Sequence, residues 1–537
     1  MRRSALPSRP RALSDRAVAP LPARALARIA TFLLCRLGVP ALCAAGVGLL
    51  YGDALHYAFL YDDGLDLARG EQRSVLSLLT SAEGAFYYRP IPFLVWKGMH
   101  AVLGWYDPFW FHLLPLAFHA LNGWLVYRLA RALALRPLAA GVAAALFLVF
   151  PFHYQAVPWA GAWFHPLVTA LLLATLLAYR RARLDHSRCW LALSLGCTGL
   201  ALFTHEYAST VGLLVAGLEL WLYRQGQVRA PRPYALLYIA LALGFALWWL
   251  AVPKWPRAFT LDEVSLVRNG LMFLQALLWP LAIGWRWAPP SLLAHPEAAV
   301  AVASALALPL AFWLYGRWQL RAWLLLALGW LVVTALPVWL TLPFEYLEDG
   351  ARLYYLPGVG IALGWAALAQ RLAPGGWRHR GGQVLLLALY GWAIVQSLDF
   401  LAVRRAMYAE GTALLRQAVA ATYRHADGPV LFVNFPAWKA PAVPAFPLGN
   451  TGVTFVPEYV LLGQALHVNG GAPTPVESLA TDALPGGWPA HYGPHGAWTG
   501  AAELAAASQR AAAIYLTRYT PAGPWLERVD TLPFPGE

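Results

Sequence analysis

Charged residues are scarce in this sequence: 12% of its 537 residues are Asp, Glu, Lys or Arg, whereas 59% are hydrophobic. The mean hydropathy is correspondingly high, at +0.51. The interior of a water-soluble protein of this length cannot hide so much apolar surface, so the composition excludes a soluble globular protein. It predicts a polytopic membrane protein.

Cysteines, nucleotide-binding motifs and repeats are also few or missing. The sequence has four cysteines, all in or beside apolar segments and without the spacing of metal ligands, so we expect them to be small hydrophobic residues. No convincing GxGxxG or Walker sequence is present, which favours an activity that works without a nucleotide. No repeat of solenoid length stands out.

Acidic residues are outnumbered, with 27 Asp and Glu against 40 Lys and Arg and a net charge of +13. Such an excess can indicate nucleic-acid binding, but here the basic residues are mostly arginines in short connections between apolar runs. This is the positive-inside pattern of cytoplasmic loops. We therefore expect a lipid bilayer, and no nucleic acid, as a partner.

Apolar runs able to cross a bilayer of about 30 Å predict an all-α bundle of about 11 transmembrane helices, within a range of about 10–13. The runs lie near 37–57, 110–128, 138–152, 165–180, 190–204, 208–223, 233–252, 299–316, 322–342, 353–370 and 383–402. An arginine- and proline-rich arm at 1–36 marks the cytoplasmic side, and the later arginine clusters then fall on that side. The stretch 268–284 would break this pattern if it crossed, so we predict that it is re-entrant or lies in the outer interface.

Two regions differ from the rest of the predicted bundle, which covers 37–402. The first outer loop, 58–109, is far longer than the connections of about 2–8 residues in helix bundles, and its aromatic content predicts helices lying in the headgroup layer. From 403 to 537 the composition shifts to proline, glycine and small polar residues with strand-like runs. We predict a small extracytoplasmic α/β domain there, on a multi-pass protein of the plasma or inner membrane with a cytoplasmic N-terminus.

An acidic pair, Asp62 and Asp63, directly follows the first apolar run. Carboxylates are costly near hydrocarbon, so a pair at the mouth of a helix bundle indicates a functional site. Neighbouring side chains in an extended segment point opposite ways. One acid can therefore act as a general base with a raised pKa, while the other anchors the loop or binds a divalent cation, Mg or Mn. The alternative is a solvated turn before Gly64.

Other polar residues also fall on the predicted helices. His112 and His119 are seven residues apart and so share one face, with Asn122 within a quarter turn of them. Such a stripe either contacts substrate or joins the helix to its neighbours. His205 and Glu206 end a later run, where a structural ion pair or a cap is the alternative to a functional contact.

Arg352 lies beside Tyr355 where a predicted helix enters from the outer face. Its guanidinium could hold a lipid-linked phosphate through bidentate hydrogen bonds, whereas ordinary snorkelling to the headgroups is the alternative. A metal site built from His153, His165 and His205 is conceivable, but no HxxH or HExxH spacing supports it.

Four segments together resemble the GT-C superfamily of polyprenyl-phosphate-sugar-dependent transferases. The likeness is strongest to the protein O-mannosyltransferase-like branch, which includes the transmembrane TPR-containing O-mannosyltransferases. The first two segments are Phe59 to Gly64 and the stretch from Tyr88-Arg89-Pro90-Ile91 to Tyr127. The others are Pro151 to Trp159 and Arg352 to Gly360.

This resemblance implies a GT-C fold whose first outer loop carries the catalytic aspartate, Asp62 or Asp63. Arg89 matches the family's Arg-Pro motif and Arg352 its late arginine. The third motif usually has an acid where this chain has Gln155, and His165 stands near where another acid is common. The TPR array is absent, so the choice of acceptor does not carry over.

We therefore expect a glycosyltransferase that moves a sugar, most simply mannose, from a polyprenyl-phosphate donor to a hydroxyl on a glycan, lipid or protein outside the cytoplasm. A flippase or carrier would instead predict inverted repeats and midplane charges, which the sequence lacks apart from Asp399. A non-catalytic membrane partner in an envelope complex would depend on the outer domain and not on the acidic pair.

Overall fold

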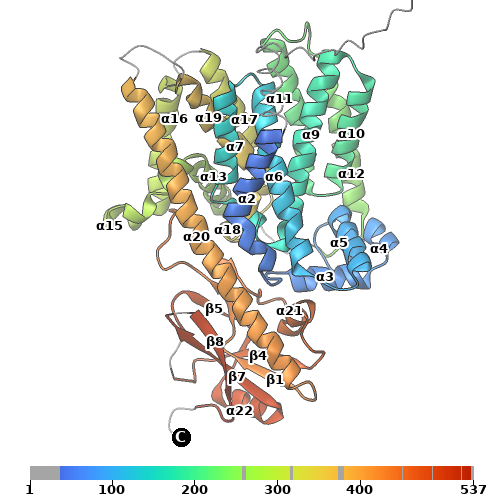
Figure 1. Cartoon of the computed structure of the whole chain (residues 1–537), viewed down its shortest axis with the longest axis vertical. Helices are drawn as coiled ribbons and strands as arrows, with labels where there is room; N and C mark the ends of the chain where they lie inside the picture. The colour runs from blue at the N-terminus through green and yellow to red at the C-terminus, as the bar shows by residue number, and fades with distance from the viewer. Residues whose placement is uncertain are drawn as a thin grey trace, which may run out of the picture.

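A computed structural model describes residues 37–256, 262–314, 318–372, 380–449, 452–485, 488–521 and 523–533. The described chain is mostly helical and ends in a small α/β part. The helices form a bundle in the upper part of Figure 1, and the strands lie below it. The predicted cytoplasmic arm at 1–36 lies outside the described residues.

The bundle contains twelve larger helices among the described residues, some joined directly and others through shorter helices. In chain order they are α2 (Val39–Tyr51), α6 (Pro108–Ala132), α7 (Pro137–Leu148), α9 (Phe164–Asp185), α10 (Arg188–Leu202), α11 (Val211–Arg224), α12 (Ala235–Ala251), α13 (Glu263–Leu277), α16 (Pro296–Leu314), α17 (Trp318–Trp339), α19 (Pro357–Leu368) and α20 (Arg380–Arg424). The short helices between them are α8 (His153–Ala156), α14 (Trp279–Ala282), α15 (Pro290–Leu293) and α18 (Phe344–Glu348).

Among the described residues, five helical stretches are long and apolar enough to cross a membrane, which identifies a membrane protein. They are Val39–His56, Ala160–Asp185, Pro296–Trp313, Leu320–Trp339 and Gly381–Arg424. Four of the other predicted runs form apolar helices of only 10–17 residues. These are shorter than the roughly 20 residues that a straight span needs, so the predicted count of about 11 is not confirmed.

The stretch predicted to be re-entrant, 268–284, is not one straight helix. Its two parts, Glu263–Leu277 and Trp279–Trp287, meet at an angle of 87°. Pro280 in the first turn of α14 explains the break, because proline lacks the N–H that a continuing helix would use. This bend is compatible with a re-entrant loop and with a broken span alike.

Small residues bring the helices of the bundle close together. A Cβ on Gly360 of α19 would lie 2.6 Å from the Trp330 side chain of α17, and one on Gly364 would lie 2.8 Å from Ala327. On α6, a Cβ at Gly123 would meet Leu148 of α7 at 2.8 Å. Such close approach is the usual means of packing helices in a membrane.

The C-terminal part contains two sheets. The five-stranded sheet has the order β6-β4-β1-β7-β8, in which only the β7–β8 pair is antiparallel. Its strands are β1 (Val430–Val433), β4 (Val476–Ala480), β6 (Ala497–Trp498), β7 (Ala513–Thr520) and β8 (Gly523–Val529). The second sheet, β3-β2-β5, is antiparallel and comprises β2 (Pro436–Lys439), β3 (Val453–Thr454) and β5 (Tyr492–Pro494). The C-terminal part also contains two helices, α21 (Leu462–Val468) and α22 (Ala501–Arg510).

Helix α20 connects the bundle to the sheets as one unbroken helix of 45 residues. The boundary predicted at residue 403 therefore falls inside this helix, and the first strand begins only at Val430. Helices α3 (Asp63–Gln72), α4 (Val75–Thr80) and α5 (Pro90–Leu103) form the loop after α2. They lie at the same end of the bundle as the C-terminal domain (Figure 1).

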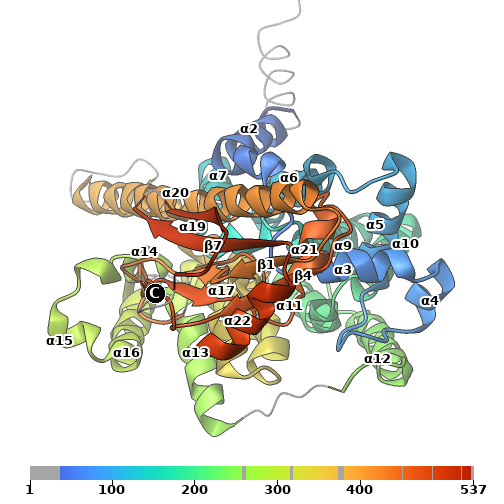
Figure 2. The ribbon, with the colours of Figure 1, turned by 90° about the horizontal axis from the view of Figure 1, so that it is seen from below.

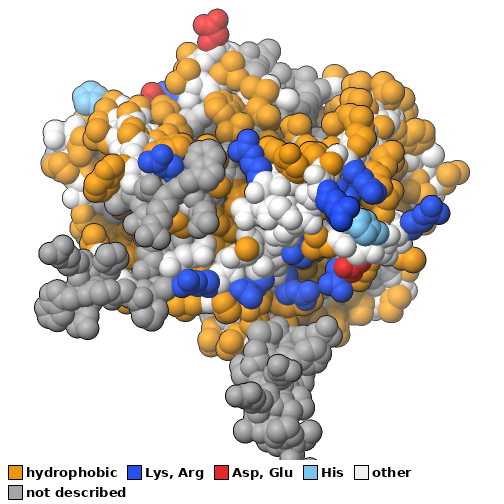
Figure 3. All heavy atoms as spheres, turned by 90° about the horizontal axis from the view of Figure 1, so that it is seen from above, with side chains coloured by type: hydrophobic (Ala, Val, Ile, Leu, Met, Phe, Trp, Pro, Cys, Tyr) orange, Lys and Arg blue, Asp and Glu red, His pale blue; other side chains and the backbone are white. Residues whose placement is uncertain are grey.

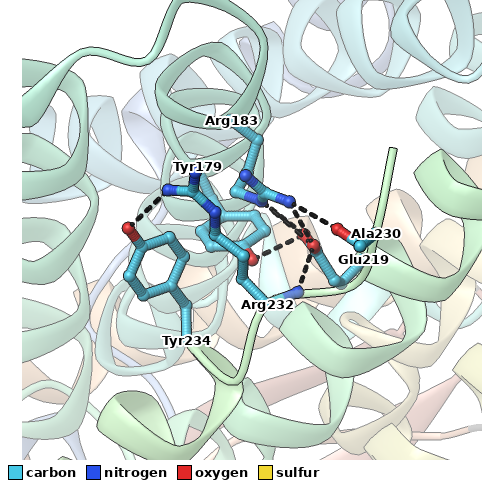
Figure 4. Close-up of polar contacts among 6 residues, drawn as sticks. All are labelled: Tyr179, Arg183, Glu219, Ala230, Arg232 and Tyr234. Carbon is cyan, nitrogen blue, oxygen red and sulfur yellow. Dashed lines mark hydrogen bonds and ion pairs between the residues drawn. The ribbon is translucent and has the colours of Figure 1, made fainter. Parts of the chain in front are cut away.

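The opposite end of the bundle is basic. Viewed from that end, Lys and Arg side chains gather on the surface with few acidic ones (Figure 3). Beneath this surface Arg183 of α9 forms an ion pair with Glu219 of α11 at 2.7 Å, and both side chains are buried. The Tyr179 hydroxyl and the Arg232 backbone N–H also donate to the Glu219 carboxylate, at 2.7 and 2.9 Å (Figure 4).

Candidate functional site between the bundle and the C-terminal domain

The acidic pair begins α3, directly after a residue with an unusual backbone. Tyr61 has φ 52°, in the left-handed region that residues other than glycine seldom adopt. Its N–H donates to the Phe455 carbonyl at 3.0 Å, and its ring stacks on Trp159 with 4.4 Å between centroids. Strained residues that their surroundings hold in place are frequent at functional sites.

Asp63 is fully buried and its carboxylate is held by N–H donors. The Trp159 indole N–H donates to Oδ1 at 2.9 Å, and the Leu60 backbone N–H donates to Oδ2 at 3.2 Å. Burial raises the pKa of Asp63 well above its ordinary value, and the charges of Asp62 and Asp66 add to this rise. Asp63 therefore anchors the start of α3.

Asp62 is partly exposed and occupies the N-cap position of α3 without capping it through its side chain. Burial by the surrounding protein raises the pKa of Asp62, whereas the Arg352 guanidinium and the Tyr459 hydroxyl both favour its charged form. Of the two predicted acids, Asp62 is thus the one that a substrate can reach.

Arg352, whose positive charge favours the ionised form of Asp62, is held by uncharged partners. Its Nη1 and its backbone N–H both donate to Gln155 Oε1 at 3.0 Å, and its Nη2 donates to the Tyr346 hydroxyl at 3.0 Å. The Gln155 amide in turn donates to the Asp349 carbonyl at 2.9 Å. Where the resemblance led us to expect an acid, a neutral amide orients Arg352 without neutralising it.

A second charged group lies next to the pair. Arg69 Nη1 lies 3.0 Å from Asp66 Oδ1, and the Tyr87 hydroxyl donates to the same oxygen at 2.8 Å. Burial raises the pKa of Asp66 to about 6. Arg89 pairs with Glu206 at 2.9 Å, and its guanidinium lies 4.6 Å from the ring of Tyr87.

Asp66, Tyr87 and Arg89 line a cavity of about 10 Å³ together with Phe164. This is room for about one water molecule. Arg89 and Glu206 were both predicted to contact substrate, but in the structure they form an ion pair with each other. A phosphate would therefore have to compete with the Glu206 carboxylate for Arg89.

The histidines divide into two groups. His165 and His205 lie with 4.7 Å between ring centroids, and His205 Nδ1 is 3.4 Å from Glu206 Oε2. His153 instead lies against Tyr355, at 4.3 Å between centroids. Within the described part of the chain, no three His, Cys, Asp or Glu side chains are grouped so as to hold a metal ion.

The predicted stripe on α6 lies in the core of the bundle. His119 Nδ1 is 2.7 Å from the Tyr355 hydroxyl, to which the Asn122 amide donates at 3.2 Å. His112 Nδ1 is 2.8 Å from the Pro108 carbonyl in its own helix. These hydrogen bonds tie α6 to the start of α19 through His119, Asn122 and Tyr355. They correspond to the second possibility given for this stripe, that it joins the helix to its neighbours.

Sequence reasoning did not single out Trp159, Tyr346 or Tyr459. Trp159 binds Asp63, Tyr346 binds Arg352, and the Tyr459 hydroxyl favours the ionised form of Asp62. Trp159 ends one of the segments that carry the family resemblance, so of the three it was the easiest to find from the sequence. Nothing in the local sequence marks Tyr346 or Tyr459, although Tyr346 binds an arginine only six residues further along the chain.

The chain matches no model of a known protein family and no curated protein. The class of this protein is therefore described from its fold and its site alone. It is a membrane protein with a helical bundle and a small C-terminal α/β domain, in which the charge of Arg352 favours the ionised form of the partly exposed Asp62.

Proposed function

We propose that this protein is an integral membrane glycosyltransferase of the GT-C kind, with about 11 membrane crossings. It transfers a sugar, mannose or a similar hexose, from a polyprenyl-phosphate donor to an acceptor hydroxyl outside the cytoplasm. The observation that carries the proposal is the state of Arg352, whose hydrogen-bond partners in the described part of the chain are the uncharged Gln155 and Tyr346 and whose positive charge favours the ionised form of the partly exposed Asp62. One group is suited to taking a proton and the other to holding a phosphate.

In the proposed reaction, Asp62 takes the proton of the acceptor hydroxyl. The acceptor oxygen forms a bond to the anomeric carbon while the bond from that carbon to the phosphate oxygen breaks. The electron pair leaves with polyprenyl phosphate, and Arg352 stabilises the charge that develops there. Attack opposite to the leaving group inverts the configuration of the sugar.

A divalent cation held by both acids fits the site poorly. Asp63 is fully buried and each of its oxygens already accepts one N–H hydrogen bond, so of the pair the partly exposed Asp62 carboxylate is the more open ligand. In the proposed mechanism Arg352 therefore takes the place that a cation would occupy beside the phosphate.

The distribution of charge supports the proposed sidedness. The arginine-rich end lies opposite to the site (Figures 1 and 3), and cytoplasmic ends of membrane proteins are enriched in Lys and Arg. The site and the C-terminal domain then face the extracytoplasmic leaflet, where a lipid-linked sugar reaches Asp62 laterally and a water-borne acceptor reaches it from the other side.

The test is transfer by purified protein in lipid, with radiolabelled polyprenyl-phosphate mannose, glucose or arabinose and cell-envelope acceptors. We expect Asp62→Asn to lower the transfer rate by about 10²–10⁴, the usual contribution of a general base. The matched control is Asp53→Asn in the same region, whose side chain is 71% exposed and which should retain wild-type rates. Absence of transfer from every donor, or full activity of Asp62→Asn, would refute the proposal.

A further inference from the structure

A groove opens on the side of the bundle, lined by none of the described residues of the candidate functional site. Helices α11, α17 and α19 lie side by side in both ribbon views (Figures 1 and 2), and a cavity of about 530 Å³ lies among them. Leu213 and Leu220 of α11 and Leu325 of α17 are roughly half exposed at its rim, whereas Leu129 of α6 and Leu363 of α19 are buried at its floor. The groove therefore reaches from the surroundings of the bundle into its core, and its volume is typical of ligand sites, which hold about 300–1,000 Å³.

Two glycines keep this groove open. In membrane helices glycine usually lets neighbouring helices approach closely, as Gly360 does against Trp330. At Gly217 of α11 and Gly329 of α17, in contrast, an added Cβ would meet no atom within 4 Å, although both residues line the groove. These two glycines therefore do not bring helices together, and the space beside them is free for another molecule.

The polar lining of the groove lies at one end. Arg224 and Gln225, at the end of α11, are the only charged or amide side chains that line it, and the lining that begins at Leu213 extends about 18 Å along the helix to reach them. This is the basic end of the bundle, where Glu219 is already paired with Arg183. Within the described part of the chain no ion pair involves Arg224. A long apolar groove with one unpaired cation at its end matches a molecule with one anionic head and an apolar tail.

We propose that this groove binds an anionic phospholipid from the leaflet at the basic end of the bundle. Its phosphate lies at Arg224, and one acyl chain lies between α11 and α17 along Gly217 and Gly329. A guanidinium binds phosphate through charge-assisted hydrogen bonds, and basic pockets between membrane helices on the cytoplasmic side are suited to anionic headgroups. The lipid then fills the gap between the two helices and supplies packing contacts that their own side chains do not make.

This lipid differs from the donor of the proposed reaction. The donor phosphate is assigned to Arg352, which precedes α19 at the end of the bundle near the C-terminal domain, whereas Arg224 lies at the opposite end. A donor lipid bound in the groove by its phosphate would therefore present its sugar on the wrong side for Asp62. The inference stands whether or not the protein is a glycosyltransferase.

The experiment uses full-length protein in phosphatidylcholine vesicles that contain a trace of photoreactive lipid. The probes are phosphatidylglycerol and phosphatidylcholine, each with a diazirine in an acyl chain, and mass spectrometry measures their cross-links to the α19 peptide that contains Leu363. Leu363 is buried, so lipid that merely surrounds the bundle does not reach it. We expect the phosphatidylglycerol probe to label this peptide more strongly than the phosphatidylcholine probe.

Two variants separate the charge from the space. Arg224→Gln should lower labelling by the phosphatidylglycerol probe about fivefold, the usual effect of one basic residue on an anionic lipid, and should affect the phosphatidylcholine probe less. Arg188→Gln removes the same charge at an exposed arginine of α10 that does not line the groove, and should match the wild type. Gly217→Leu fills the groove and should abolish labelling by both probes. Gly141→Leu, at an exposed glycine of α7 that also has open space around it, should not change labelling.

Three results would overturn the inference. The first is equal labelling of the α19 peptide by the phosphatidylglycerol probe in the wild type and Arg224→Gln. The second is displacement of this probe by an equal amount of polyprenyl phosphate but not of phosphatidylglycerol, which would assign the groove to a prenol lipid. The third is a dimer in the vesicles that Gly217→Leu dissociates, which would assign the groove to a second copy of the chain. No step of sugar transfer is measured, so failure of the proposed function leaves the lipid result intact.

Discussion

At the scale of single residues, two adjacent aspartates have different surroundings and therefore different uses. Asp63 accepts N–H bonds through both oxygens inside the protein, whereas Asp62 is partly exposed and its ionised form is favoured by the charge of Arg352. Burial raises the pKa of both acids, but only Asp62 has an arginine as the main group that favours its charged form. A base is active when ionised, so the transfer rate should rise as pH increases through the pKa of Asp62.

We expect Arg352→Gln to change both rate and pH dependence. Without the guanidinium the pKa of Asp62 rises further, because the largest interaction that lowers it is lost, and the rise in rate moves to higher pH. The lost stabilisation of the leaving phosphate should lower the maximal rate by about 10²–10³. Steady-state rates between pH 5 and 9 measure both effects. Arg181→Gln, at an exposed arginine of α9 that pairs with Asp185, serves as the control and should match the wild type.

The sequence predicted the acid and the arginine but not the groups that tune them. Asp62, Asp63 and Arg352 could be found because charge is rare in so apolar a chain and each stands next to an apolar run. Tyr346 and Tyr459 belong to a chain with 24 tyrosines, and no local pattern distinguishes these two. Tyr346 binds Arg352 only six residues away, whereas the influence of Tyr459 on Asp62 arises only when segments about 400 residues apart are packed together, which no local propensity encodes.

At the scale of secondary structure, two prolines explain why the chain between α7 and α9 does not form a long helix. Between Phe150 and Trp163 the chain has Pro151 and Pro158 and forms only α8 and a single 3-10 turn, Ala160–Ala162. The irregular backbone places Gln155 and Trp159 at the site. The apolar runs could be read from the sequence, but the effect of each proline could not: Pro151 and Pro158 interrupt this run, whereas Pro115, Pro309 and Pro337 lie inside continuous helices.

The contact between α3 and α21 predicts the effect of a single methyl group. Gly64→Ala places a Cβ against the Ala465 backbone and should destabilise the protein by about 1–3 kcal/mol, as overpacking does. Thermal unfolding in detergent measures this. A matched control is Gly98→Ala on α5, where nothing lies within 4 Å of an added Cβ and alanine should be neutral or stabilising. Equal melting temperatures for the two variants would contradict the close packing.

The buried ion pair at the basic end makes a different prediction. Glu219→Gln leaves Arg183 buried without a counter-charge and should cost about 3–5 kcal/mol, whereas Asp185→Asn breaks an exposed pair and should cost at most about 1 kcal/mol. Unfolding by denaturant gives both values. The pair lies at the end opposite to the site, so transfer per folded molecule should stay at the wild-type level in both variants.

At the scale of the whole molecule, the proposed sidedness can be measured without any activity. In a cysteine-free variant, Glu83→Cys between α4 and α5 should react with a membrane-impermeant maleimide added outside intact cells. Arg136→Cys between α6 and α7 should react only after the membrane is opened. Both side chains are exposed, so labelling reports their side of the bilayer. The reverse pattern would place Asp62 on the cytoplasmic side and rule out the proposed donor.

Helix α20 has a mechanical consequence for the assembly. A continuous helix of 45 residues is about 67 Å long, more than twice the roughly 30 Å thickness of the hydrocarbon layer. It therefore acts as a stiff stalk between the bundle and the sheets. Because the sheets are also tied to the segment before α3 through Asn469 and Phe59, the C-terminal domain is fixed at two points, and it cannot swing away from the acidic pair like a hinged flap without breaking one of them.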